Sequence, residues 1–174
     1  DEVREVERES EELSEELRRR HEEVVKESEE VSKEIEERIR EVIRDLRRVL
    51  RKLEEDGVRK EILEEIEKVV RDVEREAERI LREVERVNER VRELSKRNIK
   101  ETEEVNKKVR DELRDGDSRE EVVKELRELH DRSRKKVEDI AREARDMHRK
   151  AADKLRRLME DLKRVLEEIR KKVE

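Results

Sequence analysis

The sequence reads SEELS at residues 10–14, SEEVS at residues 28–32, and LRRVL at residues 46–50, with leucine at both serine positions. The three stretches are evenly spaced along the chain. Because an α-helix has about 3.6 residues per turn, this spacing makes about five whole turns, and the three stretches share one side of a helix. A 7-residue repeat makes helices supercoil to the left, and an 11-residue repeat to the right. An 18-residue repeat does neither and predicts straight helices.

The same repeat organises the apolar residues of the whole chain. Apolar or small polar residues recur every three or four positions, which is the spacing of a stripe along one face of a helix. The first stripe occupies positions 3, 6, 10, 13 and 17 and continues at 18-residue intervals to Leu53. The second runs from Ile62 to Leu113 and the third from Val122 to Val173. One apolar stripe on each of three helices predicts a helical bundle.

The composition limits the class of protein. Charged residues make up 61% of the 174 residues, the net charge is only −6, and aromatic residues, proline and cysteine are absent. An ordinary globular domain is about 25% charged. High charge with few aromatic residues is also found in disordered chains. The regular apolar stripe favours long helices or a coiled coil instead.

The charge pattern also limits the partners. The sequence has no basic stripe for phosphates and no aromatic side chain to stack on bases, so nucleic acid is not an expected partner. No segment is apolar for long enough to cross a bilayer, and none resembles the hydrophobic part of a signal peptide. We therefore expect a soluble chain without a targeting signal or a membrane partner.

The two glycines divide the chain into three nearly equal lengths. Gly57 and Gly116 each follow an acidic residue, in EEDGV (54–58) and LRDGDS (113–118). A helix commonly ends in a glycine with left-handed backbone conformation, so both sites are expected helix ends. Ser118 and Glu121 match the capping-box pattern S-x-x-E at the start of the next helix. The glycines therefore mark two turns between three helices.

These turns set the predicted fold. Helices are expected at about residues 2–55, 59–114 and 119–173, each roughly 80 Å long. Because the turns are short, neighbouring helices should run antiparallel. We predict a single all-α domain over residues 1–174, an elongated, untwisted antiparallel three-helix bundle with an 18-residue repeat.

Two layers of the predicted bundle carry the same polar residues. The first and second helices should run antiparallel, so the numbers of residues that lie side by side on them should sum to a constant. The first and third helices should run parallel, so the numbers of residues that lie side by side on them should differ by a constant. Both constants come to 118 at residue 12, the centre of the first serine pair, and again at residue 30, the centre of the second. Each layer then contains two serines, one asparagine and one histidine. The layers are Ser10, Ser14, Asn106 and His130, and Ser28, Ser32, Asn88 and His148.

The third copy of the layer is aliphatic, with Leu46, Leu50, Val70 and Leu166 at the corresponding positions. Hydroxyl, amide and imidazole groups can satisfy one another by hydrogen bonds, whereas a buried polar group without a partner is costly. We therefore predict complete hydrogen-bonded sets that specify helix register. The alternative is that positions 14, 32, 88, 106, 130 and 148 are half-exposed and form no network. A less regular polar set is also expected, formed by His21, Asn98, Ser95, Thr102 and Ser133.

The three histidines all fall at core or core-flanking positions of the stripes. Burial disfavours the charged imidazolium, so the histidine pKa values in the folded chain should lie below the free value of about 6.5. A folded chain with such histidines is expected to lose stability in acid.

The modular layers, strong helix formers, two glycine turns and surfaces saturated with Glu, Arg and Lys resemble computationally designed (de novo) parametric helical bundles with buried hydrogen-bond networks. The resemblance covers the whole chain but is one of style. No signature motif defines such proteins, so no functional residue is carried over from them. The resemblance implies a designed protein without a natural biochemical function.

Catalysis and metal binding are not expected. His130 and Ser133 are i, i+3 neighbours near Asp131, but a Ser-His-Asp triad also needs a pocket and an oxyanion hole. Continuous helices offer no free backbone N–H groups for such a hole. His130 and His148 are about 27 Å apart along a helix, too far for one metal ion. We expect no enzyme activity, metal site or cofactor.

Two functions fit the sequence. One is a structural scaffold whose polar layers specify register and which requires no partner. The other is a binding module of a designed hetero- or homo-oligomer, because a broad apolar stripe suits a four-helix arrangement that lacks one member. Such a module would accept a partner helix or a second copy, and its buried histidines could make it pH-responsive.

Overall fold

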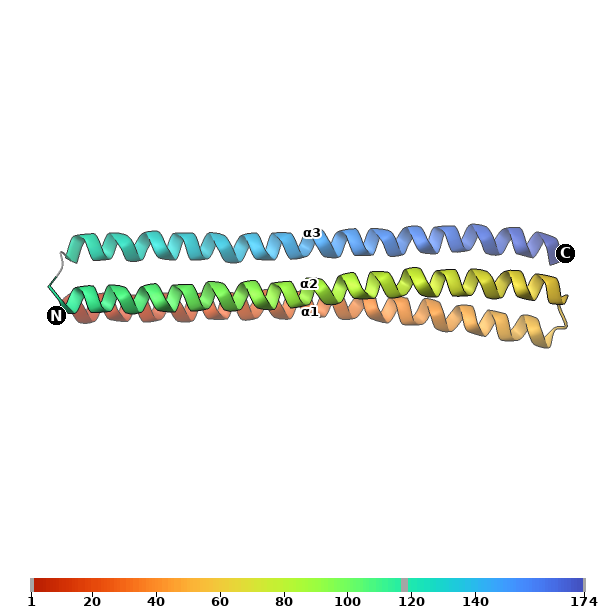
Figure 1. The fold of residues 1–174 in the computed structure, drawn as a ribbon, viewed down its shortest axis with the longest axis horizontal. Coiled ribbons are helices and arrows are strands. Elements are labelled where there is room, and N and C mark those ends of the chain that lie inside the picture. The colour runs from red at the N-terminus through yellow and green to blue at the C-terminus, as the bar shows by residue number, and fades with distance from the viewer. Residues whose placement is uncertain (1, 117–118, 174) are drawn as a thin grey trace. The chain divides into compact units, whose positions relative to one another are not determined.

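The computed structural model describes residues 2–116 and 119–173. They form three α-helices: α1 (Glu2–Glu55), α2 (Lys60–Arg114) and α3 (Arg119–Val173) (Figure 1). No strand occurs in the described part of the chain. The predicted all-α three-helix bundle is confirmed.

The end of α1 has the hydrogen bonds expected of a glycine-terminated helix. Gly57 has φ of 71°, the Val58 N–H donates to the Leu53 carbonyl at 3.2 Å, and the Gly57 N–H donates to the Glu54 carbonyl at 3.2 Å. This pattern satisfies carbonyls that the helix leaves without partners and is known as a Schellman motif. Leu53 and Val58 both pack against the nearby core, so the motif also buries apolar surface.

The end of α2 also has a glycine with left-handed backbone conformation. Gly116 has φ of 87°, and its N–H donates to the Leu113 carbonyl at 3.4 Å. The expected capping box of Ser118 and Glu121 depends on Ser118, which lies outside the described residues. That expectation stays a prediction.

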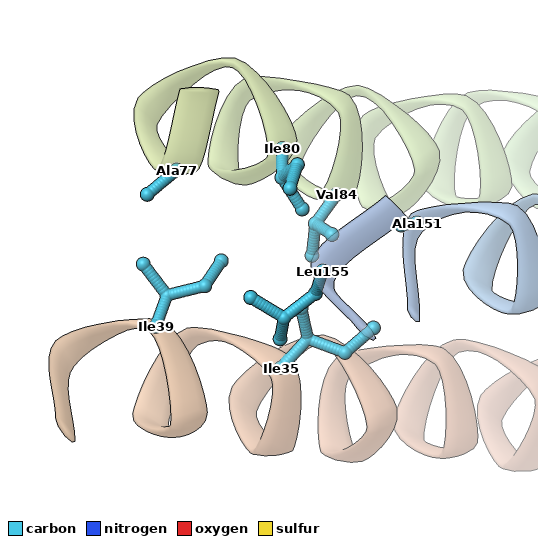
Figure 2. Close-up of a cluster of buried hydrophobic side chains, with 7 residues drawn as sticks. All are labelled: Ile35, Ile39, Ala77, Ile80, Val84, Ala151 and Leu155. Atoms are coloured by element: carbon cyan, nitrogen blue, oxygen red, sulfur yellow. The ribbon is translucent and has the colours of Figure 1, made fainter. Parts of the chain in front are cut away.

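The chain divides into two compact units, each with one segment of every helix. Unit 1 comprises residues 1–29 and 88–145, and unit 2 comprises residues 30–87 and 146–174. In unit 1, an apolar core cluster is formed by Val6, Val109, Leu113, Val122 and Leu126. In unit 2, one apolar cluster draws residues from all three helices (Figure 2). A second cluster in unit 2 is formed by Leu46, Ile62, Ile66, Val70, Val73 and Ile169.

The contacts within each unit show the predicted register. In unit 1, three ion pairs between α1 and α3 join residues 118 positions apart, so these segments run parallel. The α1–α2 hydrogen bonds Ser14–Asn106 and Ser28–Asn88 join residues whose numbers sum to 120 and 116, so these segments run antiparallel. In unit 2, Ser32 and His148 are 116 positions apart. The predicted constant of 118 therefore describes the contacts to within about half a helical turn.

We expect the Gly57→Ala variant to lose about 1 kcal/mol of unfolding free energy. An L-residue is strained at a φ of 71°, whereas a Cβ added at this glycine would meet nothing within 4 Å. The cost should therefore come from the backbone alone. Guanidinium chloride unfolding measures it, with Gly57→Asn as a control of smaller cost because asparagine tolerates this conformation better. Equal stability of Gly57→Ala and the parent chain would contradict the role given to this glycine.

Candidate functional site

The polar side chains inside the bundle are the candidate site, and most of them are fully buried. Ser14 and Asn88 are half-buried. The alternative prediction was that six of these positions are half-exposed. Four of them are only 1% to 5% exposed: Ser32, Asn106, His130 and His148. The alternative therefore holds only for Ser14 and Asn88. The buried polar residues are Ser10, His21, Ser28, Ser32, Ser95, Asn98, Thr102, Asn106, His130, Ser133 and His148.

His21 in unit 1 is the most completely bonded of these residues. It is 1% exposed, and both of its ring nitrogens are hydrogen-bonded. The Asn98 amide Nδ2 lies 2.8 Å from His21 Nε2, and because an amide nitrogen can only donate, Nε2 is the acceptor. His21 Nδ1 therefore carries the proton and donates to Ser95 Oγ at 2.9 Å. The ring is neutral and held in one tautomer.

The same set continues onto α3. The Asn98 amide also donates to the Ser133 carbonyl at 3.2 Å, and Thr102 Oγ1 donates to the Asn98 carbonyl at 2.7 Å. Since the Thr102 hydroxyl proton is used there, Ser133 Oγ donates to Thr102 Oγ1 across 2.9 Å. We call these residues the His21 set. It joins all three helices of unit 1 and comprises His21, Ser95, Asn98, Thr102 and Ser133.

The corresponding positions in unit 2 are apolar. The residues 18 positions away from the members of the His21 set all belong to a single buried cluster. Their side chains point toward one another (Figure 2). This correspondence was not predicted from the sequence, although the 18-residue repeat reveals it. Unit 2 therefore shows that the bundle can pack these positions without any polar group. The apolar counterparts, in the same order, are Ile39, Ala77, Ile80, Val84 and Ala151.

The first predicted layer is only partly bonded. The Asn106 amide donates to Ser14 Oγ at 2.5 Å. Ser10 Oγ, Asn106 Oδ1 and His130 Nε2 are buried without a hydrogen-bond partner among the described residues. The prediction of a complete set is therefore wrong for this layer. A serine hydroxyl is only one bond beyond Cβ, so it reaches a partner on another helix only when that partner faces it directly.

The second predicted layer contains at least two hydrogen bonds. In unit 1, Ser28 Oγ donates to Asn88 Oδ1 at 2.7 Å. In unit 2, Ser32 Oγ is hydrogen-bonded to His148 Nε2 at 2.9 Å. The first of these bonds joins α1 to α2, and the second joins α1 to α3.

The aliphatic third copy lies in the core of unit 2. Leu46 and Val70 are buried there. Leu50 and Leu166 are half-buried and pack against the same cluster. The copies of the layer therefore differ in chemistry while both kinds remain in the interior.

Burial shifts the histidine pKa values in unit 1. Burial, together with the smaller effect of the charge on the adjacent Arg20, lowers the pKa of His21 to about 4. Burial also lowers the pKa of His130, with Arg134 adding to the shift and Asp131 and Glu16 opposing it. Both directions agree with the effect expected from the sequence, because an imidazolium in the core loses its hydration.

Ion pairs also join the helices, and they were not predicted from the sequence. Arg20 binds Glu138 through two hydrogen bonds, Nε to Oε1 at 2.7 Å and Nη2 to Oε2 at 3.0 Å. These bonds lower the pKa of the Glu138 carboxyl. The constant of 118, applied to charged residues as well as to serines, would have found this pair.

A cavity of about 440 Å³ lies between α1 and α3 in unit 1, with His130 and Ser133 in its wall. The rest of the wall includes the apolar side chains of Leu13, Leu17 and Val137. The cavity is bounded by helices, whose interior amides already donate to their own carbonyls. It therefore offers no backbone donors to stabilise an oxyanion.

Two comparisons with known proteins and two features of the described residues complete the picture of the site. No protein-family model matches the chain, and no curated protein has a significantly similar sequence. Within the described residues, no cluster of three or more His, Cys, Asp or Glu side chains is arranged to hold a metal ion. None of the helices, as far as they are described, has an apolar stretch long enough to cross a bilayer.

We expect His21→Ile to lower the unfolding free energy by about 1–3 kcal/mol, because Ser95 and Asn98 then remain buried without their partner. Replacing the whole His21 set by its unit 2 counterparts should cost less, or stabilise the chain, because no polar group is stranded. The replacements are His21→Ile, Ser95→Ala, Asn98→Ile, Thr102→Val and Ser133→Ala. Guanidinium chloride unfolding compares the variants, with exposed Glu22→Ala as a control. A fivefold variant less stable than His21→Ile would contradict this interpretation.

We expect unit 1 to lose stability in acid. The pKa of His21 is about 4 in the folded chain and about 6.5 in the unfolded chain, so the unfolded chain binds more protons between these values. The contribution of neutral His21 to the free energy of unfolding is therefore complete above pH 6.5. It declines as the pH falls toward 4, by at most about 3 kcal/mol. Imidazole NMR titration measures the pKa, and amide exchange at pH 7.5 and about pH 5 compares the units. A His21 pKa at or above 6.5, or equal loss of protection around Leu46, would contradict the expectation.

Proposed function

We propose that the chain is a designed structural scaffold, without a natural biochemical activity, in which buried Ser, Asn and His side chains specify helix register. One observation carries the proposal. The His21 set connects three helices with hydrogen bonds at positions that unit 2 fills with Ile39, Ala77, Ile80, Val84 and Ala151. Since apolar residues suffice for packing there, the polar residues serve another purpose.

That purpose is discrimination between registers. Aliphatic stripes are nearly uniform, so a slip of one helical turn, about 5.4 Å, exchanges one Val or Ile for another at modest cost. The same slip moves the Asn98 amide out of reach of His21 Nε2, now 2.8 Å away, and leaves both groups buried and unbonded. A polar side chain in a coiled-coil seam fixes register in the same way.

The regularity of the sequence supports a designed origin. The same repeat holds in all three helices, the turns contain the only glycines, and no proline or cysteine interrupts the pattern. Uniform helix formers and an idealised backbone are the usual choices in computational design. The exchange of a polar set for an apolar one at unchanged positions fits a modular plan.

Distance measurements between spin labels test the register function. Cysteines replacing the exposed residues Glu22 and Arg97 report the α1–α2 register in unit 1, and the chain has no native cysteine to interfere. We expect one narrow distance distribution in the parent chain. The fivefold apolar variant should give a broader or multiple distribution although it remains helical. Equally narrow distributions in both chains would overturn the proposal.

A second candidate function is that of a module that accepts a partner helix. The observation that favours it is in unit 2, where Val49 and Met159 are 43% and 44% exposed. A helix that packed over this part of unit 2 would remove such apolar surface from water. Mass measurement in solution with and without added helices distinguishes this module from a self-contained bundle.

A further inference from the structure

The cavity between α1 and α3 in unit 1 has room for a small organic molecule. Its volume is about 440 Å³, and Leu13, Leu17 and Val137 contribute apolar side chains to its wall. An engineered cavity of about 150 Å³ with apolar walls holds one benzene molecule. The cavity in unit 1 is roughly three times as large, so two fused aromatic rings fit inside it.

The valine at position 137 contributes to this room. Val137 is buried, and the residue one repeat later is Leu155, which packs inside an apolar cluster of unit 2 (Figure 2). Unit 2 therefore accepts a side chain that is larger by one methylene group at the corresponding position. Leucine at position 137 is thus a substitution that reduces the cavity and that the repeat itself already contains.

One polar side chain in the wall lacks a partner in the protein. His130 is 4% exposed and lines the cavity, and its Nε2 makes no hydrogen bond among the described residues. Ser133 also lines the cavity, but it already donates to Thr102 within the His21 set. A buried polar atom without a partner is costly, so a molecule that supplies the bond recovers that cost.

The imidazole of His130 suits a hydroxyl group. Burial lowers the pKa of His130, so its ring is neutral at pH 7 and has one nitrogen that donates and one that accepts. Nε2 is covered in the structure. Because the torsion that turns an imidazole ring is broad, a modest rotation brings a ring nitrogen toward a group in the cavity.

The charges around the cavity favour an uncharged molecule. The charged side chains of the wall are all in ion pairs, so an ionic ligand would have to compete with a partner that is already present. These side chains are exposed or half-buried and form the mouth of the cavity, and such exposed pairs are weak enough to part when a molecule enters. The pairs are Glu16 with Arg134, Arg20 with Glu138 and Glu23, and Arg19 with Glu15.

We propose that the α1–α3 cavity of unit 1 binds a small, uncharged aromatic alcohol of the phenol class. The rings lie against Leu13, Leu17 and Val137, where apolar surface of both molecules leaves water. The hydroxyl group forms a hydrogen bond with His130. This binding function is additional to the specification of register and does not depend on it.

Three fused-ring compounds test the proposal. 2-Naphthol carries the hydroxyl group, 2-methylnaphthalene has a methyl group in its place, and 2-naphthoate is charged. The chain has no aromatic residue, so the fluorescence of each compound is measured without a background from the protein. We expect saturable binding of 2-naphthol to the full chain, and binding of 2-naphthoate that is roughly tenfold or more weaker, because burial of a charge is costly.

A cavity-filling variant locates the site. Val137→Leu should weaken binding of both uncharged compounds roughly fivefold or more, because the added methylene group occupies part of the space that the rings need. Val3→Leu makes the same change at an exposed position of unit 1 that lies outside the cavity. This control should alter the affinity less than about twofold.

A second variant tests the hydrogen bond. Leu166 stands two repeats after His130, so His130→Leu is compatible with a helix of this bundle. The preference of the chain for 2-naphthol over 2-methylnaphthalene should fall roughly tenfold in this variant, because only 2-naphthol loses a hydrogen bond. His148→Leu makes the same change in unit 2, away from the cavity, and should leave the preference unchanged.

Each outcome supports or overturns a stated part of the proposal. Absence of saturable 2-naphthol binding, or binding that Val137→Leu leaves unchanged, overturns the site. Equal affinity for 2-naphthoate overturns the uncharged ligand, and an unchanged preference in His130→Leu overturns the hydrogen bond. If circular dichroism shows that either variant is unfolded, methyl NMR of the parent chain decides. 2-Naphthol should then shift the signals of Leu13 and Leu17 and not that of Ile39, and the reverse result overturns the site.

Discussion

The repeat of five whole helical turns is the constraint on which the other features of this chain depend. It returns the same face of each helix to the core at regular intervals, so many positions one repeat apart occupy similar environments. At such positions burial is retained while the chemistry of the side chain varies. Ser10, Ser28 and Leu46 show this freedom, because all three are buried although two are polar. A helix with a 7-residue repeat would need supercoiling to keep such equivalence.

Equivalent positions allow polar and apolar interiors to be compared within one molecule. At His21 the interior contains an imidazole with both nitrogens bonded, and at Ile39, one repeat later, an aliphatic side chain of similar burial. The aliphatic residue gains from removal of apolar surface from water, whereas the histidine recovers by hydrogen bonding roughly what its desolvation costs. The polar version thus adds little stability. Its advantage is that only one register satisfies its bonds.

The sequence was sufficient to predict the features that depend on backbone periodicity. Gly57 and Gly116 marked the helix ends, and the constant of 118 gave the register that Arg20 and Glu138 show. Hydrogen-bond partners were predicted less well. One residue of helix rises about 1.5 Å, so an error of two residues in height displaces a side chain by about the length of a hydrogen bond. His130, assigned to a complete layer, is left with an unbonded Nε2 for this reason.

The charged surface follows the same logic as the polar core. An exposed ion pair contributes at most about 1 kcal/mol, so charges covering 61% of the sequence are a weak source of stability. Their arrangement matters more, because juxtaposed like charges disfavour a contact that the apolar stripe alone would permit. In unit 1 opposite charges meet where α1 and α3 are in contact, as Arg20 and Glu138 show. In unit 2 the same two helices contribute apolar residues to one buried cluster, among them Ile39 and Ala151. In the scaffold that we propose, polar residues in the core select the register of the helices, and charges at the surface favour the contacts in which opposite charges meet.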